Sequence, residues 1–183
     1  MKRLITIAIV AFAFAGIGFA AEDTADDTTH ITIAEVAMID NSGALGDFSF
    51  TAPTAEGDTL DHTGPDANSY LQYTSTVVEG NARTISAELD TMLQGLKMTI
   101  AAGAPGGTGT CGTQTSTTFT VDDNDAADIV TAIGSGQTGT GATDGPNLTI
   151  SVFLDAEHPE ELFVAAETEI LITYTLTEDA VIE

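Results

Sequence analysis

The sequence lacks tryptophan, carries a single cysteine and has only four basic residues among 183. One cysteine excludes a disulfide-stapled scaffold and every metal site that needs several thiolates. Four Lys and Arg against 28 Asp and Glu give a net charge of −24, which would repel the phosphates of a nucleic acid. Three histidines leave little material for a histidine-rich metal centre. We therefore expect no nucleic-acid partner and no multi-cysteine cofactor.

Hydrophobic residues, by contrast, make up 43% of the chain. A chain this apolar can bury a core, and its length suits one domain. Aromatic residues are scarce, at 6%, so paired carboxylates have no aromatic platform of the kind that a glycosidase offers its sugar. The composition favours a secreted, soluble, acidic module over an enzyme.

The first twenty residues have the features of a targeting segment. Two basic residues precede an apolar run over residues 4–19, and the small residues Gly18 and Ala20 suit a cleavage site. The run is shorter than the roughly 20 residues that span a bilayer. We predict a signal peptide over residues 1–20, secretion to the extracellular space or cell surface, and no stable membrane insertion after cleavage.

Cleavage would leave Arg83 and Lys97 as the only strong cations, so the net charge would become 2 − 28 = −26. Residues 21–29 are rich in Asp and Thr and predict a flexible acidic leader. A charge this large keeps a monomer soluble and makes self-association depend on salt or divalent cations.

The remaining chain shows the period-2 alternation of apolar and polar residues that is typical of β-strands. Helical periodicity is weak, with one or two turns conceivable at residues 91–96 and 158–163. Two Gly-rich stretches, residues 101–114 and 134–146, predict long surface loops. The alternating segments are residues 31–39, 48–50, 71–77, 83–89, 96–100, 119–121, 129–133, 148–154 and 170–176. We predict an all-β fold: a single antiparallel, Ig-like or pilin-like β-sandwich of about eight or nine strands over residues 30–183.

The first alternating segment follows the leader directly. Ile31, Ile33, Ala37 and Ile39 share one face, with a turn signal just after them at residues 40–43. A strand over residues 30–39 could fold back onto its own sheet or be donated to a neighbouring subunit. Both arrangements bury the same face, so the pattern leaves them open.

Two further features are candidate sites. The cluster of Asp122, Asp123, Asp125 and Asp128 offers several oxygens on a turn, as weak calcium binding requires, although a solvated acidic turn is the simpler interpretation and the EF-hand spacing is absent. Cys111 lies in a Gly/Thr loop, which predicts a mobile free thiol or an intermolecular bridge. No basic residue near it would activate a thiolate, and no G-x-S-x-G motif is present, so we expect no catalytic residues.

Several stretches carry a resemblance to a known group of proteins. They are residues 29–39, 50–53, 71–75, 83–89 and 172–177. They resemble a family of small secreted bacterial β-sandwich proteins, and the overall pattern is similar to spore-coat-U-type and chaperone–usher-type filament subunits. In such pilins an N-terminal strand completes the neighbouring subunit. Those pilins often carry a disulfide, from which this single-cysteine chain departs.

These observations lead to two functional expectations. The first is a structural subunit of an extracellular filament or pilus, with further copies of itself as partner and no cofactor apart from possible calcium. Its N-terminal strand would be exchanged between copies. The alternative is a monomeric secreted binding module or adhesin for glycans or divalent cations, using the Gly-rich loops and acidic clusters.

Overall fold

The computed structural model describes residues 29–43, 45–63 and 67–179. The predicted signal peptide and nearly all of the predicted leader therefore lie outside the described residues. No helix in the described ranges is long and apolar enough to cross a membrane.

The chain divides into two units, Met1–Thr32 and Ile33–Glu183. Every strand of the described residues belongs to the second unit. The first strand among the described residues begins at Val36.

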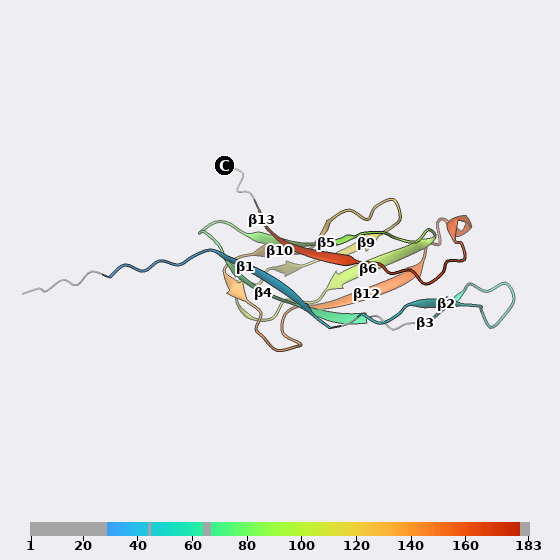
Figure 1. The fold of residues 1–183 in the computed structure, drawn as a ribbon, viewed down its shortest axis with the longest axis horizontal. Helices are drawn as coiled ribbons and strands as arrows, with labels where there is room; N and C mark the ends of the chain where they lie inside the picture. Colours follow the sequence, from blue (N-terminus) through green and yellow to red (C-terminus); the bar gives the residue numbers. More distant parts are fainter. Residues whose placement is uncertain (1–28, 44, 64–66, 180–183) are drawn as a thin grey trace, which may run out of the picture. The chain divides into compact units, whose positions relative to one another are not determined.

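The second unit is an all-β sandwich, as predicted. Its larger sheet has the strand order β7-β11-β4-β12-β6-β9, with β1 paired to β4, and its smaller sheet has the order β13-β5-β10-β8. Figure 1 shows β13, β5 and β10 in one layer and β1, β4 and β12 in the other. A separate hairpin joins β2 to β3. The strands are β1 (Val36–Ser42), β2 (Ser49–Thr51), β3 (Asp61–Thr63), β4 (Ala67–Thr76), β5 (Arg83–Leu89), β6 (Leu96–Ala102), β7 (Thr108–Gly109), β8 (Thr113–Gln114), β9 (Ser116–Phe119), β10 (Ala127–Ile133), β11 (Gly136–Gln137), β12 (Asn147–Leu154) and β13 (Ile172–Glu178).

The described residues hold thirteen strands, more than the eight or nine expected. Five of them, β2, β3, β7, β8 and β11, have only two or three residues and account for the excess. Strands of two or three residues are too short to show a period-2 alternation in the sequence. The only helical element in the described part is a 3-10 turn at Pro159–Glu161, within one of the two expected stretches.

The core lies between the two sheets and follows the alternation of the sequence. β6 is the clearest case, because Leu96, Met98 and Ile100 are buried while the residues between them are half-buried. Lys97 accordingly projects away from the core. The two sheets contribute the fully buried side chains Leu71, Ile85, Ile100, Phe119, Ile129, Val130, Leu148 and Ile150.

The two Gly-rich stretches are not simple surface loops. β11 in one stretch pairs with β7 in the other and with β4, so both are attached to the larger sheet. Gly109 has a φ of +88°, and a Cβ there would meet the backbone of Ser135. Glycine is needed at this position because the two segments approach each other closely.

Candidate functional site

β1 is an edge strand of the larger sheet. It pairs antiparallel with β4 from Val36 opposite Thr76 to Ser42 opposite Tyr70. In the described residues β4 is its only strand partner. Ile39 on β1 is only half-buried. An edge strand exposes unpaired backbone groups on one side, which is where another chain can add.

The expected strand over residues 30–39 is wrong in its bounds. Ile31 and Ile33 lie outside any strand and are 82% and 80% exposed, whereas Ala37 and Ile39 do lie in β1. The strand also continues to Ser42, through the expected turn. The reason is that β4 offers backbone partners as far as Tyr70, and pairing overrides the local turn preference.

An ion pair holds the beginning of β1. The Glu35 carboxylate lies 3.4 Å from the Arg83 guanidinium, at the start of β5. The Arg83 side chain is 9% exposed, and its Nε has no hydrogen-bond partner among the described residues. We call residues 29–35, which precede β1, the N-terminal segment.

A second exposed apolar stretch precedes β13. Phe163 is 68% exposed and Val164 is fully exposed, and both lie in a segment outside any strand. Within the described residues, the backbone of residues 163–170 makes no hydrogen bond to either sheet. We call these eight residues the pre-β13 segment. The sequence signal for it is a run of five uncharged residues, 162–166, with glutamates at 160 and 161 before it and at 167 and 169 after it, which alternation alone does not detect.

Cys111 is a free thiol, one of the two expected states, and it is buried in the fold. The Cys111 sulfur lies 3.7 Å and 3.8 Å from the carbonyl oxygens of Thr108 and Gln137, and the Tyr73 hydroxyl donates a hydrogen bond to the Cys111 carbonyl. Burial raises the pKa of Tyr73, and the neighbouring Cys111 adds to this shift. An intermolecular bridge would require this part of the fold to open.

The acidic cluster predicted as a weak calcium site is dispersed. Asp122 and Asp123 lie in the turn after β9, whereas Asp128 lies on β10, and all four aspartates are exposed. Among the described residues no three His, Cys, Asp or Glu side chains are grouped so that they could hold a metal ion.

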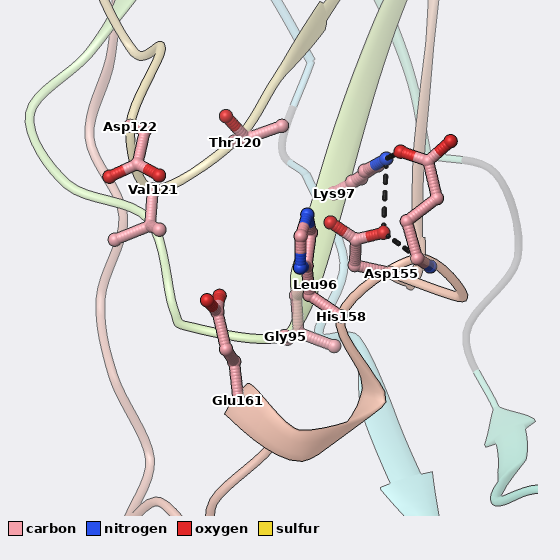
Figure 2. A pocket seen from close by; sticks show the side chains of 10 residues that line it. Gly95, Leu96, Lys97, Thr120, Val121, Asp122, Asp155, His158 and Glu161 are labelled. Atoms are coloured by element: carbon pink, nitrogen blue, oxygen red, sulfur yellow. Dashed lines mark hydrogen bonds and ion pairs between the residues drawn. The ribbon is translucent and has the colours of Figure 1, made fainter.

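A small polar pocket lies beside Lys97. The Lys97 ammonium is 3.0 Å from an Asp155 carboxylate oxygen and 3.1 Å from a Glu157 carboxylate oxygen. Figure 2 shows Lys97 and Asp155 on one side of the pocket, with Asp122 on the other. The volume is about 150 Å³, well below the roughly 300–1,000 Å³ of typical small-molecule sites. The pocket therefore suits water better than a glycan or cofactor.

Electrostatics in this pocket favour a stable ion pair. Hydrogen bonds from Lys97 to Asp155 and Glu157 raise the pKa of Lys97. Burial opposes ionisation of Asp155, but the Glu157 amide and Lys97 outweigh it and hold the Asp155 pKa below its usual value. Both groups stay charged at neutral pH, which keeps the ion pair intact.

Comparison with known proteins adds no relative to this picture. No family model matches the chain, and no curated protein and no solved structure is similar to it.

Proposed function

We propose that the protein is a non-enzymatic structural subunit that associates with copies of itself outside the cell to form filaments. The observation that supports this most directly is the exposure of Ile31 and Ile33 in the N-terminal segment. Burying one isoleucine is worth about 1.5–3 kcal/mol, so two exposed isoleucines on one short segment favour a partner that covers them.

The proposed mode of contact is strand addition. Exposed edges and unpaired segments bind by strand addition, in which backbone hydrogen bonds give affinity and alternate side chains fit the acceptor. The N-terminal segment is the donor in this proposal, while β1 itself stays paired with β4 in its own subunit. This differs from exchange of the whole 30–39 stretch.

Salt should control the assembly. The sequence carries 28 acidic residues, so copies repel each other at low ionic strength. The Debye length falls from roughly 30 Å at 0.01 M salt to about 3 Å at 1 M. We expect light scattering to rise with salt or calcium, and electron microscopy to show fibres where scattering is high.

The decisive variant is Ile31→Asp combined with Ile33→Asp. It should abolish fibres and leave the circular dichroism spectrum unchanged, because both residues lie outside the strands. The matched control is Thr32→Asp with Ala34→Asp, which adds the same charge to the same segment and keeps both isoleucines. Fibres that persist in the isoleucine variant, or a parent protein that stays monomeric at every salt concentration, would refute the proposed function.

A further inference from the structure

We propose that the free edge of β13 pairs antiparallel with β13 of a second copy about a two-fold axis. The contact joins the smaller sheets of the two copies into one continuous sheet. It uses neither the N-terminal segment nor β1, so it does not rest on the proposed function. Three features of β13 carry the inference: its unpaired backbone edge, the absence of charge over residues 172–177, and a sequence that is complementary to itself.

β13 is the last strand of the layer that it shares with β5 and β10 (Figure 1). In the described residues β5 is its only strand partner, and the two strands pair from Ile172 opposite Leu89 to Glu178 opposite Arg83. The backbone groups on the other side of β13 therefore form an open edge of seven residues. Such an edge is a template for pairing with another chain.

The hydrogen bonds at the two ends of β13 show which backbone groups face this open edge. The Asp90 amide donates to the Leu171 carbonyl, and the Asp179 amide donates to the Ala82 carbonyl. Bonded pairs recur at every second residue of an antiparallel ladder, so the odd-numbered residues of β13 direct their backbone toward β5. The even-numbered residues, 172, 174, 176 and 178, direct their amides and carbonyls toward the open edge.

The open edge of β13 lacks the protection that the other edge strands have. Proteins blunt an edge by keeping it short or by placing charges on it. β7, β8 and β9 have only two to four residues, and β1 carries Asp40 at its centre. β13 has seven residues and no charge before Glu178, in a chain with 28 acidic residues. A partner with the same uncharged strand can approach this edge without bringing carboxylates together.

The outer face of β13 is complementary to itself. Thr173, Thr175 and Thr177 are all exposed on this face. A two-fold axis at Thr175 places this threonine opposite its own copy and Thr173 opposite Thr177 of the second copy. Threonine pairs across neighbouring strands are favourable. The same register brings the even-numbered residues, whose backbone groups are free, into the hydrogen-bonded positions of the new ladder.

The inner face of β13 fits the same register. Ile172, Tyr174 and Leu176 are half-buried, because β13 lies at the border of the core. Pairing about Thr175 places Tyr174 opposite Leu176 of the second copy, and Leu176 opposite Tyr174. Glu178 then faces Ile172, so no pair in the register sets two carboxylates opposite each other. The occupant that this edge fits is thus a second copy of β13.

Cysteine cross-linking tests the position of the two-fold axis. Directly opposite residues in a non-hydrogen-bonded pair have Cα atoms about 4.5 Å apart, which a disulfide can bridge. Thr175→Cys should therefore form a disulfide-linked dimer on mild oxidation with copper phenanthroline. Thr173→Cys is the matched control, because its own counterpart lies four residues away, at roughly 14 Å. An equimolar mixture of Thr173→Cys and Thr177→Cys chains, one of them carrying a size tag, should again cross-link.

The cross-linking is best done in a background that removes other contacts. Cys111→Ser leaves the introduced thiol as the only one in the chain. Ile31→Asp with Ile33→Asp removes the isoleucines on which the proposed fibres depend, so the dimer is measured alone. A dimer that forms equally with Thr173→Cys and Thr175→Cys, or with neither, would overturn the inference.

A charge variant tests the same axis without a cross-link. Thr175→Glu sets two carboxylates directly opposite each other and should weaken dimerisation by about tenfold in sedimentation equilibrium at roughly 0.15 M salt. Thr173→Glu adds the same charge to the same face but meets Thr177 of the second copy. It should weaken dimerisation by less than about threefold. Equal losses for the two variants would contradict a two-fold axis at Thr175.

The outcomes separate this inference from the proposed function. Fibres in the parent protein without a Thr175→Cys disulfide would overturn the β13 dimer and leave the proposed function standing. A Thr175→Cys dimer in a parent protein that never forms fibres would support the β13 contact and overturn the proposed function.

Discussion

β6 and β1 are both seven-residue antiparallel strands of the same sheet, yet they are held very differently. β6 lies between β12 and β9 and buries every second side chain. β1 has β4 as its only strand partner in the described residues and buries no side chain fully. Ile100 on β6 is fully buried, while Ile39 on β1 is only half-buried.

The difference shows that position in the sheet, more than apolar alternation, decides how much a strand contributes to stability. A central strand packs against both sheets, whereas an edge strand keeps one side open to solvent or to another chain. β6 therefore belongs to the core of the sandwich, whereas β1 lies at an exposed edge of the larger sheet.

Truncating a matched isoleucine in each strand should give the largest effect. We expect Ile100→Ala to lower the free energy of unfolding by about 2–5 kcal/mol, since it opens a cavity in the core. Ile39→Ala should cost about 1 kcal/mol or less, because its side chain is only half-buried. Urea denaturation would measure both. Equal losses would mean that β1 is as much a part of the core as β6.

The ion pair at the beginning of β6 should give a smaller, pH-dependent effect. The folded-state pKa of Asp155 is lowered, so its contribution is present above the unfolded value of about 3.9 and is lost as pH falls through the lowered folded value. We expect Asp155→Asn to flatten the fall in thermal midpoint below pH 4. Asp122→Asn, at an exposed carboxylate on the far side of the pocket, is the control; matching acid profiles for the two variants would contradict this assignment.

The smallest effect is expected at Cys111. Its sulfur faces two carbonyl oxygens, to which a serine hydroxyl could donate as well. We expect Cys111→Ser to change stability by less than about 1 kcal/mol and to leave assembly intact. The native thiol should react slowly with a disulfide reagent until the protein unfolds. A dimer on non-reducing gels that disappears in the variant would show that Cys111 bridges copies after all.

The sandwich could be predicted from the sequence because its central strands alternate strictly. Residues 83–89, 96–100 and 148–154 match β5, β6 and β12 closely, since one face of each strand contacts the core. β1 was misplaced because Ile31 and Ile33 alternate in the same way without any strand opposite them. Period-2 alternation predicts that a segment has an apolar face, but it does not predict which chain covers that face.

The candidate site was harder to predict for a topological reason. The pocket beside Lys97 draws on three separate stretches, 95–97, 120–122 and 155–161, and only the sheet order brings them together. Phe163 lies just beyond the 3-10 turn, and the sequence pattern marked its surroundings as a helical turn. Its exposure depends on the path of the chain between the two sheets, which no local pattern encodes.

The glycines of this fold also define where foreign peptides could be inserted. An added Cβ at Gly57 or Gly80 would meet nothing within 4 Å, but both glycines have a positive φ, so a peptide inserted at either turn should leave the glycine itself in place. At Gly107 and Gly109 the same atom would collide with the neighbouring loop. Turns that all contain glycine thus differ in how they would tolerate engineering: those at Gly57 and Gly80 have open space around them, and the one at Gly107 and Gly109 lies against the backbone of a neighbouring segment.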